Sequence, residues 1–196
     1  MTIKSEISWT ARVAIWTAML AAWLAQAFAA NNPLDADAVS YLDIAYSCLS
    51  GNWHALVHGY WSPGYPFLLA FWLRLFHVSP YHEPLAVHML TVVRLMLALA
   101  SFEFFLSAYF DAEKKLREDV VTERQGFLAE KDLRLLGYAL FFWITTFLTP
   151  PYLEQPDILV FILYLIAAGL CLRVVSSTNK WCGATHCWAE CWEQLI

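Results

Sequence analysis

Charged residues are scarce in this chain of 196 residues. Asp, Glu, Lys and Arg together make up 15% of the sequence, whereas hydrophobic residues make up 60%. Soluble domains contain about one quarter charged residues and about one half apolar residues, so the composition excludes an ordinary soluble domain. The net charge of −5 gives no indication of a nucleic-acid partner. The composition instead predicts an all-α integral membrane protein.

Regularly spaced cysteines are missing as well. Cys48 and Cys171 stand alone in the sequence, and the other three of the five cysteines fall within the last fifteen residues. Those three, Cys182, Cys187 and Cys191, have a spacing that matches no standard zinc motif. The sequence therefore predicts neither a disulfide framework nor a metal site, and it leaves open whether a divalent cation is required.

Four apolar segments are long enough to be predicted as membrane spans. They cover residues 9–30, 85–109, 133–149 and 157–175. The first resembles a secretory signal peptide, because it ends in "AFAANN", but it is longer than a signal core and further spans follow, so we predict an uncleaved span. The apolar run at residues 65–78 is short and carries Arg74, which favours a re-entrant or interfacial helix.

Basic residues predict which loops are cytoplasmic. Lys4 and Arg12 flank the start of the first span, and six further Lys and Arg residues fill the segment between the second and third spans and the first residues of the third. Arg74 is the one Lys or Arg between the first two spans, and there is none between the last two. We therefore predict a cytoplasmic N-terminus and a membrane domain made of residues 1–175. The cytoplasmic parts are predicted to be the loop 110–132 and the tail 176–196, and the outer segments 31–84 and 150–156.

The first predicted outer segment brings carboxylates to the membrane surface without cations beside them. The stretch "NNPLDADAVSYLDIA" predicts a helix that begins with Asp35 as the N-cap and has Asp37 in its first turn. Asp37 and Tyr41 lie one helical turn apart and share a face, and Gly51 is a typical helix end. This pattern predicts a short amphipathic helix on the outer surface of the membrane.

Aromatic residues and two further acids complete the predicted outer surface. Tyr60 and Trp61 belong to "GNWHALVHGYWSPGYP", whose aromatic residues are typical of a membrane interface. The second outer segment, "TPPYLEQPDILVF", carries Glu154 and Asp157 at the start of the fourth span. Each of these two acids either caps a helix or belongs to a functional site, and the residues alone leave both interpretations open.

The order of these motifs resembles that of polytopic glycosyltransferases of the GT-C fold. In particular, it is similar to bacterial relatives of dolichyl-phosphate-mannose–protein mannosyltransferases and of the lipid A aminoarabinose transferase. The matching motifs are the acids Asp35 and Asp37, then Tyr41 in "YLDIA", then "YWSPGYPFLLAF", and finally "EQPD" at residues 154–157. Family members have more spans, so the resemblance implies the N-terminal part of a GT-C-type bundle. The last stretch, "NKWCGATHCWAECWEQLI", differs in texture from the rest and is expected to be an aberrant, frame-shifted tail.

The resemblance also implies a reaction and roles for individual residues. A polyprenyl-phosphate-linked sugar would be the donor, and a hydroxyl of a lipid, glycan or protein on the outer face of a bacterial inner membrane would be the acceptor. Asp37 is the expected general base, with Asp35 as the second candidate. Cationic or hydrogen-bonding groups would stabilise the departing phosphate. The expected substrate-binding residues are Tyr41, His54, His58, Tyr60, Trp61, Arg74, Arg94, Glu154 and Asp157.

Two other functions compete with the transferase. The first is a non-catalytic membrane subunit that binds a partner through the same outer segments. The second is a small transporter, which should carry its acids near the middle of the membrane rather than at the outer mouths. The predicted second span does contain two charges, Arg94 and Glu103. These charges lie nine residues apart on opposite helix faces, so they are not expected to pair with each other.

Overall fold

The computed structural model describes residues 7–30, 34–57, 59–119, 129–153 and 156–193, with the side chains of 116–119 and 178–193 left aside. The part of the chain so described is helical and contains no strand. Three helices are long and apolar enough to cross a membrane: Trp9–Ala29, Pro80–Lys115 and Asp157–Ser177. The fold class is therefore that of a helical membrane protein.

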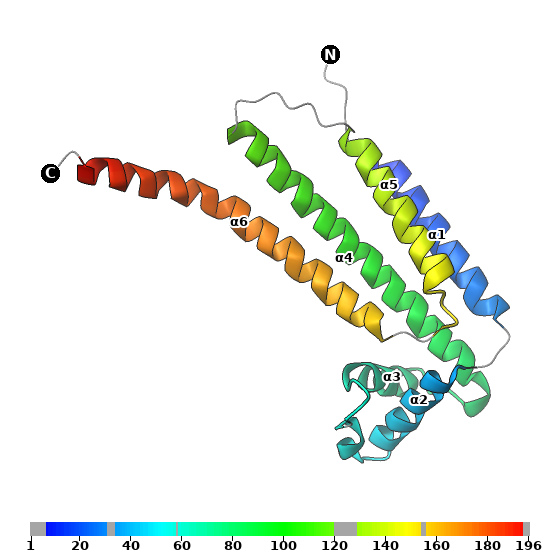
Figure 1. Ribbon diagram of the computed structural model, residues 1–196. Coiled ribbons are helices and arrows are strands. Elements are labelled where there is room, and N and C mark those ends of the chain that lie inside the picture. Colours follow the sequence, from blue (N-terminus) through cyan, green and yellow to red (C-terminus); the bar gives the residue numbers. More distant parts are fainter. Residues whose placement is uncertain (1–6, 31–33, 58, 120–128, 154–155, 194–196) are drawn as a thin grey trace.

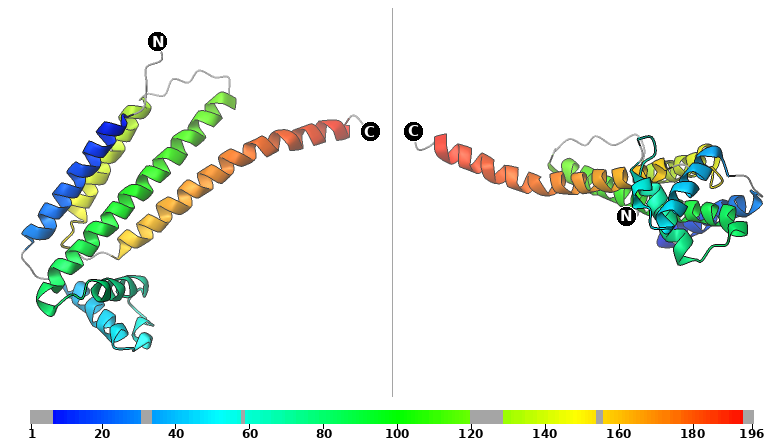
Figure 2. Two further views of the ribbon diagram at one scale, coloured as in Figure 1. Left: turned by 180° about the vertical axis from the view of Figure 1, so that it is seen from behind. Right: turned by 90° about the horizontal axis from the view of Figure 1, so that it is seen from below.

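Long helices run side by side along most of the molecule (Figure 1). They are α1 (Trp9–Ala29), α4 (Glu83–Asp119), α5 (Glu130–Trp143) and α6 (Asp157–Glu193). The view from behind in Figure 2 shows that α6 follows α4 at first and then diverges toward the C-terminus. The helical parts of α4 and α6 extend beyond the predicted spans, into the segments predicted as a loop and a tail.

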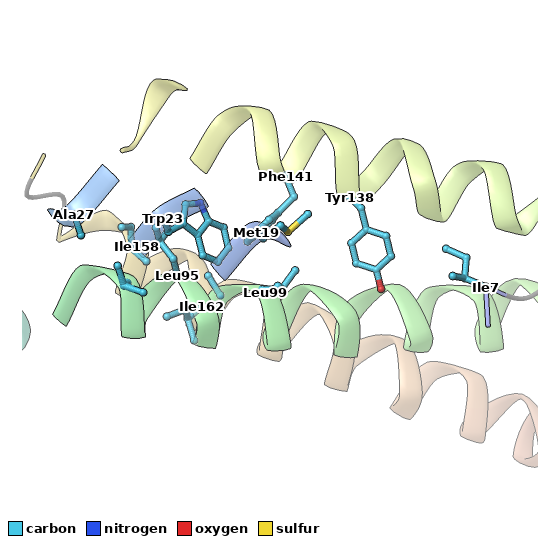
Figure 3. Packing of buried hydrophobic residues seen from close by; sticks show 12 residues of the cluster. Ile7, Met19, Trp23, Ala27, Leu95, Leu99, Tyr138, Phe141, Ile158 and Ile162 are labelled. Carbon is cyan, nitrogen blue, oxygen red and sulfur yellow. The ribbon is translucent and has the colours of Figure 1, made fainter. Parts of the chain in front are cut away.

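The core joins all four long helices near one end of the molecule. Trp23 of α1 is fully buried and meets the ring of Phe141 of α5 edge to face, with the ring centroids 6.3 Å apart. Leu95 of α4 and Ile158 of α6 belong to the same cluster (Figure 3). Further along, α6 comes very close to α4, because a Cβ on Gly169 would lie 2.5 Å from the Phe104 side chain.

The third predicted span coincides with α5 and the following π-helical turn η3 (Ile144–Leu148). The 14 residues of α5 cover about 21 Å at the usual rise of 1.5 Å per residue. In η3, the hydroxyl of Thr145 donates a hydrogen bond of 2.8 Å to the Phe141 carbonyl. Pro150 and Pro151 follow, and neither can continue a helix. A fourth crossing of the membrane stays a prediction.

A compact helical unit packs against one end of the long helices, at the bottom of Figure 1. It consists of α2 (Ala36–Leu49), η1 (Trp53–Leu56), α3 (Gly64–Leu75) and η2 (Pro80–His82). Asp35 is the N-cap of α2, and its carboxylate accepts a hydrogen bond of 2.7 Å from the Ala38 N–H. Gly51 just after α2 has a φ of 95°, which a residue with a side chain rarely adopts. The start of α6 lies at the same end of the molecule, so both acid-bearing segments are neighbours.

Candidate functional site

Helix α2 presents a buried aromatic residue and an exposed acid one turn apart. Tyr41, Ala45 and Cys48 form the face that packs on α3, and Tyr41 is only 3% exposed. Asp37 lies in the first turn and is exposed. The positive end of the helix dipole stabilises a carboxylate at this position. Asp37 therefore lies at the surface, directly beside the point where α2 becomes buried.

Two aromatic rings contact the Tyr41 ring, and a third packs on one of them. The Tyr41 ring centroid lies 4.8 Å from that of Trp61 and 4.9 Å from that of Tyr65, both in edge-to-face geometry. Tyr60 packs edge to face on Trp61 at 4.6 Å and is 79% exposed. Edge-to-face contacts place the positive ring edge against a negative ring face, so they fix the orientation of each ring. The result is an aromatic wall made of Tyr41, Tyr60, Trp61 and Tyr65.

A buried arginine supports this wall from α4. The Arg94 guanidinium carbon lies 4.4 Å from the centroid of the Tyr65 ring, which is a cation–π contact. Its Nη2 donates a hydrogen bond of 2.6 Å to the Thr91 hydroxyl, and the residue as a whole is fully buried. A buried charge in an apolar helix is costly and usually marks a functional or structural site.

Charged residues from several segments of the chain influence the pKa of the Tyr41 phenol. Burial raises this pKa most, and the negative charges of Asp37 and Asp157 raise it further, as does Tyr60. Arg94 acts in the opposite direction. Asp37 and Asp157 belong to different segments of the sequence, yet both act on one hydroxyl group. Because its pKa is raised, Tyr41 stays protonated at neutral pH and can donate a hydrogen bond.

Other predicted site residues lie elsewhere. His54 is exposed in η1, and Arg74 is exposed on α3, nine residues after Tyr65 and therefore on the opposite face. Asp35 uses its carboxylate as the cap of α2. His58 and Glu154 lie outside the described residues. Among the predicted cationic residues that the structure describes, Arg94 is the one whose charge, like those of Asp37 and Asp157, influences the pKa of Tyr41.

No group of three or more His, Cys, Asp or Glu residues in the described part of the chain could hold a metal ion.

A second charged cluster lies at the opposite end of the long helices and was not predicted from the sequence. Glu103 of α4 pairs with Arg12 of α1 at 2.9 Å and lies 3.6 Å from Arg134 of α5. Tyr138 points its hydroxyl toward α4 and donates a hydrogen bond to Glu103 (Figure 3). Arg134 also pairs with Glu130, one turn earlier, at 2.9 Å. Glu103 thus links α1, α4 and α5, and these contacts give it a structural role.

Comparison with protein-family models, with curated proteins and with solved structures finds no match. The resemblance to GT-C glycosyltransferases stays a prediction, and the site itself has to carry any functional proposal.

Proposed function

We propose that this chain is a membrane glycosyltransferase, or a portion of one, that transfers a sugar from a polyprenyl-phosphate donor to an acceptor hydroxyl. One observation carries the proposal. The charges of Asp37 and Asp157, which come from two separate segments, both raise the pKa of the buried Tyr41, and Arg94 stacks on Tyr65, whose ring contacts that of Tyr41. A pair of acids beside a hydrogen-bond donor and a cation supplies the groups that such a transfer needs.

The proposed topology has four crossings, with α5 and η3 as the third. The two acid-bearing segments lie at one end of the long helices, and the start of α1, the end of α4 and the start of α5 lie at the other (Figure 1). Lys and Arg residues are concentrated at the end of the long helices that lies away from the acids. The positive-inside rule assigns this end to the cytoplasm. The acids would then face the outer side of a bacterial inner membrane.

In the proposed reaction Asp37 is the general base. Its carboxylate takes the proton of the acceptor hydroxyl, and the acceptor oxygen forms a bond to the anomeric carbon of the sugar. The bond between that carbon and the phosphate oxygen breaks, and the phosphate leaves with the electron pair. Arg94 contributes positive charge near the departing phosphate, and the protonated Tyr41 contributes a hydrogen bond. Asp157 orients the sugar by accepting hydrogen bonds from its hydroxyls.

The donor also needs a place for its apolar chain. Val160, Phe161 and Tyr164 follow Asp157 on the same face of α6, and all three are exposed. In a membrane this face would contact lipid, so a polyprenyl chain can lie along it and bring the sugar at its end toward Asp157. The transfer would then take place at the membrane surface without a separate soluble domain.

The test compares Asp37→Asn with Asp43→Asn, a matched change on the exposed side of the same helix. The full chain is expressed in inner-membrane vesicles and supplied with polyprenyl-phosphate-mannose or polyprenyl-phosphate-aminoarabinose labelled in the sugar. We expect Asp37→Asn to lower transfer by about 10²- to 10⁴-fold, which is the usual contribution of a general base. Asp43→Asn should leave transfer unchanged, and both variants should insert normally. Wild-type rates in Asp37→Asn would refute its role as the base.

The non-catalytic subunit remains the second candidate because large apolar faces are uncovered. In α1 and α6 only 17% and 22% of the residues in the most apolar window are buried within the chain. Partner helices could cover these faces as well as lipid could. A wild-type chain that transfers neither sugar, but co-purifies in a fixed ratio with another membrane protein, would favour this candidate.

A further inference from the structure

An apolar groove runs between α1 and α4, away from the acidic site. It has a volume of about 800 Å³. Side chains from both helices line it, among them Leu20, Leu24, Met89, Val93, Met96 and Leu97. Val93 and Leu97 are 40% and 52% exposed, so the groove is open at its side to the surrounding lipid. A groove of this kind in a membrane protein accepts hydrocarbon chains rather than polar ligands.

One mouth of the groove carries polar side chains. His77, Ser79 and His82 line it there, and the Ser79 hydroxyl lies 2.9 Å from the His82 Nδ1. His77 also lines an adjoining cavity of about 610 Å³ together with Arg74. The nearby acid Glu83 forms a hydrogen bond with the Tyr46 hydroxyl. Arg74 supplies positive charge from the adjoining cavity, which shares His77 with this mouth, and the two imidazoles and the serine supply hydrogen-bonding groups at the mouth itself.

The backbone holds His77 at the mouth in an unusual conformation. Its φ is 47°, and it directly follows the end of α3. The N–H groups of His77 and Val78 donate to the carbonyls of Arg74 and Leu73, which is the Schellman pattern of helix ends. Glycine usually occupies this left-handed position, because a side chain there costs roughly 1 kcal/mol or more. This turn places His77 where its side chain lines both the groove and the adjoining cavity.

The groove and the acidic site lie on different faces of their helices. Arg74 at the groove mouth and Tyr65 in the aromatic wall are nine residues apart on α3, which places them on opposite faces. Arg94 does not line the groove. A lipid head group at Arg74 would therefore not meet Asp37 or Asp157. The groove is unsuited to the reacting end of a sugar donor.

The length of the groove fits a lipid of a single leaflet. Its α4 wall runs from Leu85 to Leu97, about 18 Å at 1.5 Å per residue. One leaflet, with its head-group region, is about 20 Å thick. A polyprenyl chain long enough to cross both leaflets would extend well past this wall, whereas the acyl chains of a glycerophospholipid would fill it.

We propose that the groove between α1 and α4 binds an anionic glycerophospholipid, with its phosphate at Arg74, His77 and His82 and its acyl chains against Leu24, Met89 and Val93. The lipid fills the space between α1 and α4 and packs against the turn between α3 and α4. This site is independent of the proposed sugar transfer, because the two share no residue.

The test is native mass spectrometry of the purified full chain in detergent, titrated separately with phosphatidylglycerol, phosphatidylcholine and undecaprenyl phosphate. Phosphatidylglycerol should bind at least about fivefold more tightly than phosphatidylcholine, since one basic residue near a lipid surface contributes about that factor. Arg74→Gln should remove about this fivefold preference. Val93→Trp should fill the groove and weaken the binding of phosphatidylglycerol by a similar factor.

Matched controls keep the result interpretable. Lys131→Gln removes a positive charge at the other end of the helices, and Leu163→Trp adds a ring to the exposed face of α6, so neither should change phosphatidylglycerol binding. His77→Gly relieves the left-handed backbone and should keep the fold while weakening binding. Equal binding of the two phospholipids, Arg74→Gln behaving like Lys131→Gln, or displacement of phosphatidylglycerol by undecaprenyl phosphate would each overturn the proposal. Loss of sugar transfer with lipid binding intact would bear only on the proposed function.

Discussion

Helix α4 carries two charges nine residues apart, the buried Arg94 and the half-buried Glu103, and the two charges are handled differently. Glu103 is paired with Arg12 and lies near Arg134, and Tyr138 donates a hydrogen bond to it. Arg94 stacks on Tyr65, and its charge lowers the pKa of Tyr41, which the exposed acids Asp37 and Asp157 raise. The comparison separates a charge cluster that joins helices from one that leaves carboxylates at the surface.

The difference has a simple energetic basis. A charge within a membrane helix needs a partner, since an unpaired one costs several kcal/mol. The Glu103 cluster satisfies its carboxylate entirely with neighbouring helices. Arg94 stacks on the aromatic ring of Tyr65, and Asp37 and Asp157 are exposed. Only the second arrangement leaves acids in a position to do chemistry.

Among the variants that test this comparison, Asp157→Asn is expected to have the largest effect on sugar transfer. The change keeps a polar residue at the start of α6 but removes the charge that acts on Tyr41. Sugar transfer should fall by about 10- to 100-fold, which corresponds to the loss of a hydrogen bond to a charged group. The thermal unfolding midpoint should stay the same. A variant with unchanged kcat/KM would exclude Asp157 from the site.

Glu103→Gln tests the charge cluster that joins the helices. It removes the negative charge between two guanidinium groups, which should lower the free energy of unfolding by about 2 kcal/mol, less than for a fully buried pair. Thermal unfolding in detergent measures this change, with Asp132→Asn at the same end as the control. Transfer by the folded variant should equal that of the wild type. A loss of sugar transfer without a loss of stability would show that Glu103 has a functional role rather than a structural one.

Arg94→Lys should have a smaller, mixed effect. Lysine keeps the positive charge but cannot stack a planar group on Tyr65, so the contact between α4 and α3 should weaken by about 1 kcal/mol. Limited proteolysis between α2 and α3 should become faster, and transfer should decline only severalfold. If proteolysis is unchanged, the stacking contributes nothing to holding the aromatic wall.

The smallest effect concerns pH. Burial, the hydrogen bond to Glu83 and the charge of Glu83 together raise the pKa of Tyr46 to about 12, with burial as the largest cause. A raised pKa favours the protonated form in the folded protein, so this stabilisation is complete below pH 10 and is lost between pH 10 and 12. Tyr46→Phe should reduce the alkaline fall in stability. An identical alkaline profile in both proteins would contradict the assignment.

Local sequence patterns predicted much of the fold. Long apolar runs marked three helices that can span a membrane, and short-range signals at Asp35 and Gly51 marked the ends of α2. These features depend on neighbouring residues, so one sequence is enough to see them. The third predicted span was harder, because its helix is short and ends in a π turn that no spacing rule marks.

Features that join distant segments could not be predicted in the same way. The partners of Glu103 lie on α1 and α5, so no i, i+4 pattern indicates them. Arg74 was expected near the acids, but the rotation of α3 points it to the other side. Asp37, Tyr41, Arg94 and Asp157 were predicted one by one, and only folding brings them to the same hydroxyl group.

The close approach of Gly169 to Phe104 has a consequence for the distant acids. Gly169 lies twelve residues after Asp157, about 18 Å along α6. The Phe104 ring packs directly against Gly169, so a Cβ at residue 169 would force the ring or one of the two helices to move. The contact thus helps to set the position of α6 on α4. A methyl group added at residue 169 is expected to shift α6, and with it Asp157, from a position that no substrate touches.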